Sequence, residues 1–249
     1  MKKIQERPAH LLPVPTSFCP GCTHGTATRI MMEALEELNT VGDTILVLPV
    51  GCGALIREFT DLDQVLAAHG RAPALATGIK RCLPDKTVLT YQGDGDLAAI
   101  GTSEIIHAAN RGEHFTTIFV NNAIYGMTGG QMAPTTLEGQ ISTTTRTGRD
   151  PKETGYPIRM CEMLATLEAP VYIVRCALNT PGNIRKAKKA VKKALEIQRG
   201  GGGFAFVELL STCPTNWKLN PVDSLKFIET HMIPYFPLGV FKDKGVDML

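Results

Sequence analysis

The stretch KTVLTYQGDGDLAAIGTSEIIHAANRGEHFTTIFVNN, residues 86–122, decides the fold. Its apolar first part predicts a buried strand over 86–92, and a helix is predicted over 97–111. A second strand is predicted over 115–122. A strand, a helix and a strand in succession form a right-handed crossover, so the two strands run parallel in one sheet. We therefore expect an α/β protein.

The rest of the chain repeats this alternation of strands and helices. Further strands are predicted over 43–50, 169–178 and 201–212, and further helices over 23–38, 64–83, 183–198 and 221–231. Proline-rich residues 1–18 predict an extended arm, and residues 128–157 predict a long functional loop. Because no repeat or linker divides the chain, we expect one domain over 1–249. Its sheet is expected to be open, mostly parallel and flanked by helices.

Composition excludes several classes of protein. A net charge of +2 gives no argument for a nucleic-acid partner, and no run of apolar residues is long enough to suggest a membrane span. The first residues do not resemble a secretory signal, so we expect a cytoplasmic protein. A reducing cytoplasm argues against disulfides, which leaves metal ligation or burial to explain the seven cysteines.

Polar side chains follow both strands of the predicted crossover. Asp94 comes just after the first strand, between Gly93 and Gly95, and Asn122 ends the second. Because both strands end at the carboxyl edge, where open α/β sheets bind ligands, the two side chains are expected to meet there. A carboxylate and an amide oxygen suit Mg²⁺, and the N-terminus of the following helix suits a phosphate. The residues predict a Mg²⁺–diphosphate site, although either motif alone would favour a surface turn.

Four cysteines have positions that suit metal ligation. Cys19 and Cys22 form a C-x-x-C pair in FCPGCTHG, which can bind zinc, bind an iron–sulfur cluster or act as a redox dithiol. The chain has no second C-x-x-C, which weakens the zinc-ribbon interpretation. Cys52 and Cys213 each follow a predicted strand and can lie at the same edge as Asp94. We interpret the others as core or incidental thiols: Cys82 in a helix, Cys161 in an irregular segment and Cys176 in a strand.

Several motifs together carry a resemblance to a known family. Gly-Asp-Gly followed by Asn-Asn at this spacing resembles the thiamine diphosphate motif, and YGMTGGQ after it resembles the beta subunits of 2-oxoacid:ferredoxin oxidoreductases. The matching region runs from about Phe18 to Trp217. AAHGRAPALATGIK also matches, and the match places His69 near the cofactor as a candidate catalytic residue. The alternative is that His69 is a structural or surface histidine.

The resemblance implies a thiamine-diphosphate-binding fold with three cofactors. Mg²⁺ would be held by Asp94, Asn122 and the Ile124 carbonyl, and a 4Fe–4S cluster by Cys19, Cys22, Cys52 and Cys213. The residues implied for cofactor binding are Val50, Gly51, Cys52, Gly53, His69, Gly93, Asp94, Gly95, Asp96, Asn122, Ile124, Tyr125, Gly126, Met127 and Thr128.

The resemblance also implies an activity and partners. The family decarboxylates a 2-oxoacid oxidatively with coenzyme A, gives acyl-CoA and carbon dioxide, and passes electrons through the cluster to ferredoxin. We find no glutamate at a recognisable position to activate thiamine. An alpha subunit is therefore implied to supply it, with gamma and ferredoxin-like delta subunits beside it. Leu55 and Gly129 replace lysines of some relatives, which favours a branched-chain 2-oxoacid such as 2-oxoisovalerate, or 2-oxoglutarate, over pyruvate.

The sequence also allows two other functions, and it allows two interpretations of one basic segment. A non-redox thiamine decarboxylase or synthase subunit would need no cluster, and a zinc-stabilised binding module would need no thiamine. The predicted helix 183–198 and the residue after it carry many cations, which usually form a solvated face. The alternative is a docking surface for acidic ferredoxin or coenzyme A phosphates. The cations are Arg185, Lys186, Lys188, Lys189, Lys192, Lys193 and Arg199.

Overall fold

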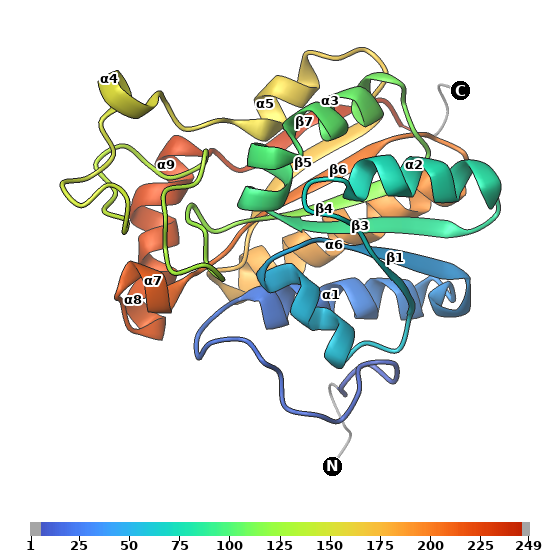
Figure 1. Cartoon of the computed structure of the whole chain (residues 1–249). Helices are drawn as coiled ribbons and strands as arrows, with labels where there is room; N and C mark the ends of the chain where they lie inside the picture. The colour runs from blue at the N-terminus through green and yellow to red at the C-terminus, as the bar shows by residue number, and fades with distance from the viewer. Residues whose placement is uncertain (1–5, 246–249) are drawn as a thin grey trace.

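The computed structural model describes residues 6–245, which contain a seven-stranded sheet in the order β2-β1-β3-β4-β6-β5-β7 (Figure 1). All neighbouring strands pair in parallel except β7, which is antiparallel to β5. The predicted α/β class, with an open and mostly parallel sheet flanked by helices, is confirmed. The strands are β1 (Thr44–Leu48), β2 (Asp63–Leu66), β3 (Thr87–Gly93), β4 (Thr116–Asn121), β5 (Tyr172–Ala177), β6 (Ala205–Leu210) and β7 (Gly239–Asp243).

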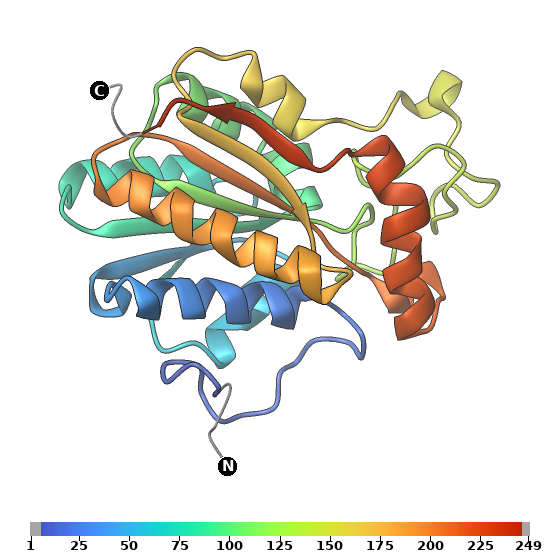
Figure 2. The same cartoon turned by 180° about the vertical axis from the view of Figure 1, so that it is seen from behind.

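Helices cover both faces of the sheet. Helices α1 (His24–Glu37) and α6 (Pro181–Arg199) lie side by side on one face, in front of the strands in Figure 2. Helices α2 (Ala72–Cys82), α3 (Thr102–Asn110) and α5 (Met160–Ala165) cover the other face. Successive strand residues alternate between the two cores, as Leu46 and Val47 do in β1. With both faces buried, the polar groups of the sheet reach solvent at its two ends.

The predicted strands agree with the structure, whereas one predicted helix is partly wrong. The five predicted strands correspond to β1, β3, β4, β5 and β6. The helix expected over 64–83 begins only at Ala72, because the residues before it form the edge strand β2 and a loop. Strand β2 is short and mostly exposed, so it lacks the apolar pattern that marks a buried strand. Strand β7 was not predicted, and Cys161 lies in α5 instead of an irregular segment.

The helix after Asp94 is interrupted. The predicted helix over 97–111 consists of a π-helical turn η3 (Gly95–Ile100) followed by α3. π-Helical turns are rare and often occur at functional sites. Residues 128–157 are irregular, as predicted, apart from α4 (Pro151–Thr154). The remaining elements are η1 (Val41–Asp43), η2 (Cys52–Glu58), α7 (Pro214–Trp217), α8 (Pro221–Phe227), η4 (Ile228–Met232) and α9 (Ile233–Tyr235).

The basic helix α6 has three kinds of cation. Lys188 and Lys192 form ion pairs with acids of α1, so they join the two helices of one layer. Lys193 pairs with Asp243 at the end of β7. Within residues 6–245, Arg185, Lys186, Lys189 and Arg199 are exposed and form no ion pair. No helix among the described residues is both long and apolar enough to cross a membrane.

Candidate functional site

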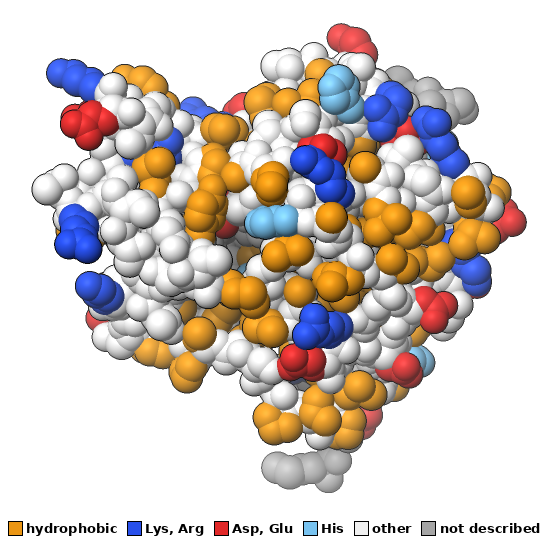
Figure 3. Space-filling model, in the orientation of Figure 1, with side chains coloured by type: hydrophobic (Ala, Val, Ile, Leu, Met, Phe, Trp, Pro, Cys, Tyr) orange, Lys and Arg blue, Asp and Glu red, His pale blue; other side chains and the backbone are white. Residues whose placement is uncertain are grey.

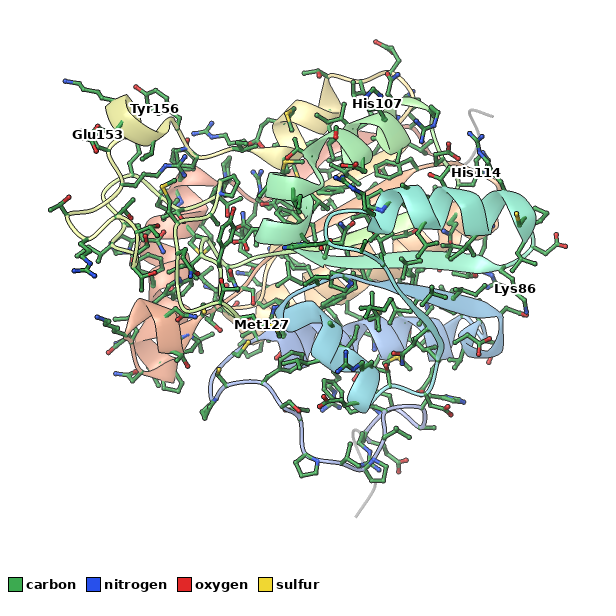
Figure 4. The ribbon with its side chains drawn as sticks, viewed as in Figure 1. Lys86, His107, His114, Met127, Glu153 and Tyr156 are labelled. Carbon is green, nitrogen blue, oxygen red and sulfur yellow. The ribbon has the colours of Figure 1, made fainter. Side chains whose placement is uncertain are left out.

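A cavity of about 320 Å³ opens at the carboxyl edge of the sheet, among the segments that follow β1, β2, β3 and β4. Met127, labelled in Figure 4, lines it, far from Lys86 and His114 at the amino ends of β3 and β4. The structure gathers there Val50, Gly51, Cys52, Gly53, His69, Gly93, Asp94, Gly95, Asp96, Asn122, Tyr125, Gly126, Met127 and Thr128. Of the predicted cofactor residues only Ile124 does not line the cavity, because it is fully buried.

The turn after β4 brings three ligand atoms together. One polar atom of the Asn122 amide lies 3.1 Å from Asp94 Oδ2 and 2.7 Å from the Ile124 carbonyl oxygen. When that atom is nitrogen, the amide donates a hydrogen bond to both. When it is oxygen, three oxygens face one another, and such a set needs a cation. Adjacent ligands of octahedral Mg²⁺ are about 3 Å apart, because Mg–O bonds are about 2.1 Å long. The donor set therefore fits Mg²⁺.

Asp94 is a buried carboxyl group that already accepts hydrogen bonds. Its Oδ2 accepts from the Ile124 N–H at 3.0 Å and from Thr135 Oγ1 at 3.0 Å, and its Oδ1 accepts from the Gly95 N–H. Burial nevertheless raises the pKa of Asp94 to about 7, because these hydrogen bonds offset only part of the loss of solvation. A divalent cation at this position would favour the ionised form.

The first asparagine of the pair holds the turn. Ala123 has a φ of +56°, which is unfavourable for a residue with a side chain. Its N–H donates to Asn121 Oδ1 at 3.1 Å, and its carbonyl accepts from Thr136 Oγ1 at 2.7 Å. Asn121 is held in turn by the buried carboxylate of Glu208, to which its amide donates at 2.8 Å. Asn121 thus shapes the turn that presents Asn122 and Ile124.

The four predicted cluster cysteines lie near one another, and two of them lie against the same turn. A Cβ added to Gly126 would lie 3.2 Å from Cys52 Sγ and 3.5 Å from Cys213 Sγ, so both sulfurs pack against this glycine. Burial, together with the neighbouring thiols of Cys213, Cys52 and Cys19, raises the pKa of Cys22 to about 12. This mutual influence places all four sulfurs in one neighbourhood.

The four cysteines differ in exposure and are not packed around a single point. Cys19 is exposed, whereas Cys213 is buried and accepts a hydrogen bond from Asn216 Nδ2 at 3.3 Å. In residues 6–245, no three His, Cys, Asp or Glu side chains are close enough to hold a single metal ion. Among the described residues, the four sulfurs therefore do not surround a single point.

The remaining cysteines lie away from this turn. Cys82 is exposed at the end of α2, and Cys176 is buried in β5, where burial raises its pKa to about 11. Cys161 is buried, and its thiol donates to Glu208 Oε2 at 3.1 Å. Glu208 also accepts from the buried Arg175. None of the three contacts the cavity, in agreement with the interpretation as core or incidental thiols.

The chain is similar to several known proteins. The family described as thiamine pyrophosphate enzyme, C-terminal TPP binding domain, matches residues 50–209. The 2-oxoglutarate synthase subunit KorB of Methanocaldococcus jannaschii is 38% identical over 88% of this chain and 79% of its own length. This chain belongs to the 2-oxoacid:ferredoxin oxidoreductase family.

Other members of the 2-oxoacid:ferredoxin oxidoreductase family match most of the chain. The ketoisovalerate oxidoreductase subunit VorA of Methanothermobacter thermautotrophicus is 49% identical over 98% of this chain, which spans only 51% of that relative. A solved 2-oxoglutarate:ferredoxin oxidoreductase from Magnetococcus marinus, with 2-oxoglutarate, coenzyme A and succinyl-CoA bound, has a TM-score of 0.79 at 26% identity. The match covers 98% of this chain and 87% of that one.

This family member also has cavity residues that sequence reasoning missed. His24, Ala99 and Ile100 line the cavity. His24 is fully buried, its Nδ1 lies 2.8 Å from the Tyr91 hydroxyl, and burial lowers its pKa to about 4. Its position two residues after Cys22, at the start of α1, was a usable signal. The contacts of Thr135 and Glu208 with the site had no local signal, because both residues are distant in sequence from the motifs they support.

Proposed function

We propose that this chain is the thiamine-diphosphate-binding beta subunit of a 2-oxoacid:ferredoxin oxidoreductase. One observation carries the proposal: the segment 122–126 contains the oxygen ligands of Asn122 and Ile124 and also lies against two cysteine sulfurs at Gly126. A diphosphate-bound cofactor and an electron acceptor would thus share a single turn of backbone. Residues 1–249 are proposed to act as one thiamine-binding domain, since a single sheet joins the described strands.

Each proposed ligand has a defined role. Asp94, Asn122 and the Ile124 carbonyl hold Mg²⁺, which balances the charge of the diphosphate. Thiamine diphosphate, when bound, supplies an electron sink for decarboxylation. Cys19, Cys22, Cys52 and Cys213 hold the 4Fe–4S cluster, and the Asn216 amide donates a hydrogen bond that stabilises the Cys213 thiolate. His69 is the candidate catalytic residue on the cavity wall.

The cavity rim indicates where the activating partner lies. Val50, Ile100 and Met127 line the cavity and are 41%, 49% and 50% exposed. Figure 3 shows hydrophobic side chains around the hollow on this face. A rim of exposed apolar residues is typical of a surface that another protein covers. We place here the alpha subunit that supplies the activating glutamate, and expect gamma and ferredoxin-like delta subunits to complete the complex.

The proposed reaction converts a 2-oxoacid, coenzyme A and two oxidised ferredoxins to acyl-CoA, carbon dioxide, a proton and two reduced ferredoxins. Among the compared relatives, the ketoisovalerate oxidoreductase subunit is 49% identical and the KorB subunit 38% identical. Leu55 and Gly129 add no charge near the site, unlike the lysines of some relatives. The higher identity favours a branched-chain substrate, 2-oxoisovalerate, over 2-oxoglutarate, and the two uncharged residues favour either substrate over pyruvate.

Anaerobic purification of the native complex tests the proposal. We expect brown protein with about four iron and four sulfide per beta chain, and reduction of a viologen dye that needs 2-oxoisovalerate and coenzyme A. Asp94→Asn should lose thiamine diphosphate but keep iron, whereas the exposed control Asp85→Asn should keep both. Colourless protein with stoichiometric zinc, or a faster rate with 2-oxoglutarate, would contradict the cluster or the substrate, respectively.

A further inference from the structure

Asp96, the second acid of the Gly-Asp-Gly-Asp sequence, gathers donors from several segments of the cavity wall. It is 1% exposed. Its Oδ1 accepts from the Val50 N–H at 3.1 Å and from the Gly70 N–H at 2.9 Å. Its Oδ2 accepts from Gln92 Nε2 at 2.7 Å. The carboxylate therefore ties the end of β1 and the loop before α2 to β3, and both of its oxygens are occupied by protein donors.

A fourth donor to Asp96 is the imidazole of His69. Its Nδ1 lies 2.6 Å from Asp96 Oδ1. Two backbone N–H groups, which can only donate, already point at that oxygen, so Oδ1 is an acceptor for the ring as well. Nδ1 must then carry the proton. In the neutral ring the other nitrogen, Nε2, has a free lone pair.

The position of His69 leaves that second nitrogen accessible. His69 and Asp96 both line the cavity, but the His69 side chain is 43% exposed and the Asp96 side chain only 1%. Nε2 is on the side of the ring opposite Nδ1, and hence on the exposed side. The contacts of the His69–Asp96 pair are separate from those of Asp94, which lead to the Asn122 turn.

The loop that carries His69 rests directly on the π-helical turn that carries Asp96. Gly70 has a φ of +78°, and a Cβ there would lie 2.8 Å from the Gly101 nitrogen. A Cβ on Gly101 would lie 2.6 Å from the Gly70 carbonyl oxygen. Such contacts are possible only between glycines. The close approach of the two backbones fixes the distance between the carboxylate and the ring.

We infer that Asp96 is a positioning residue that locks His69 in the Nδ1–H tautomer. His69 Nε2 then faces the cavity as an acceptor for an N–H, O–H or S–H group of the molecule bound there. The inference assigns His69 a protonation pattern and rests on the proposed function only for the identity of that molecule. Asp96 also lines the cavity, and the role assigned to it here is exerted through His69.

¹⁵N-histidine labelling of this chain alone, within the anaerobic complex, tests the tautomer directly, because this chain contributes only six histidines. Long-range ¹H–¹⁵N spectra distinguish a protonated nitrogen from an unprotonated one, and His69→Asn assigns the signal. We expect the neutral wild-type ring to show protonated Nδ1 and unprotonated Nε2. A wild-type ring protonated on Nε2 would overturn the inference without any variant having to fold.

Two substitutions of Asp96 distinguish a role in positioning His69 from a merely structural role. Asp96→Ala removes the acceptor, so the Nε2–H tautomer should appear and kcat should fall about 10²-fold. Asp96→Asn is the matched control. Its oxygen can occupy the Oδ1 position, and its amide nitrogen can face Gln92, whose Oε1 is buried without a partner among the described residues. This variant should therefore keep the Nδ1–H tautomer.

The outcomes distinguish this inference from the proposed function. An Asp96→Ala protein that folds and retains Nδ1–H would show that Asp96 does not set the tautomer. Failure of the wild-type complex to bind thiamine diphosphate would refute the proposed function while leaving the tautomer measurement intact.

Discussion

The effect of Asp94→Asn on the free energy of unfolding should change sign with pH. The variant should be less stable than wild type at pH 4 and more stable at pH 8. In the magnesium-free protein, burial raises the pKa of Asp94 from 3.8 to about 7. A shift of about three units corresponds to about 4 kcal/mol, at 1.36 kcal/mol per unit. The folded pKa lies above the unfolded one, so the unfolded state releases the proton first. The wild-type free energy of unfolding should therefore fall by up to about 4 kcal/mol between pH 4 and pH 7.

The asparagine variant should lack this slope and lose part of the hydrogen bonding. Its amide nitrogen must face one of the N–H groups that Asp94 now accepts, at Gly95 or Ile124, which costs about 1–3 kcal/mol. Asp94→Asn should thus be less stable than wild type at pH 4 and more stable, by about 1–3 kcal/mol, at pH 8. The variant is more stable at pH 8 because the wild-type Asp94 is then an ionised, buried carboxylate without the cation that would balance its charge.

Urea unfolding of the chelator-treated, anaerobic protein at pH 4, 6 and 8 measures these free energies. Mg²⁺ with thiamine diphosphate, at about 100 times the dissociation constant, should stabilise the wild type by about 2.7 kcal/mol and leave Asp94→Asn unchanged. The exposed Asp85→Asn control should follow the wild type throughout. Parallel pH curves for wild type and Asp94→Asn would refute the reasoning.

Three further changes test the surroundings of the site. Asn121→Ala should lower the free energy of unfolding by about 2–4 kcal/mol, because Glu208 and the Ala123 N–H lose a buried partner; adding Ala123→Gly should recover about 1 kcal/mol, because glycine adopts a positive φ without strain. Arg175→Met should cost about 3–5 kcal/mol by urea unfolding, since it leaves the Glu208 carboxylate buried without its cation. Cys213→Ser should reduce the iron and sulfide content measured by chemical analysis.

Controls make each of these three results decisive. If Ala123→Gly destabilises the Asn121→Ala background further, the positive φ at Ala123 is not a source of strain. If Arg175→Met combined with Glu208→Leu is no more stable than Arg175→Met alone, the unpaired carboxylate is not the cause of the loss. Cys82→Ser should retain full iron, and equal iron in Cys213→Ser would remove Cys213 from the proposed ligand set.

The sequence was most informative where local pattern and spacing carry the physics. A buried parallel strand is a continuous apolar run, so β1, β3, β4, β5 and β6 could be predicted. The crossover from β3 to β4 also placed Asp94 and Asn122 at one edge, because right-handed connections make the two strands parallel. Strand β2 was not predicted because an exposed edge strand has little apolar pattern. Strand β7 was not predicted because it pairs antiparallel with β5, which is distant in sequence.

By itself, the sequence determined the order of the five buried strands, the edge that carries the candidate site and the candidate ligands, because these follow from nearest-neighbour periodicity and chain direction. Only the tertiary structure decided which partners complete the site. Glu208 reaches Asn121 from β6, Thr135 reaches Asp94 from the long loop, and Asp96 turns away from the cation site to hold His69. Such contacts depend on the packing of segments far apart in the chain, and no local pattern records them.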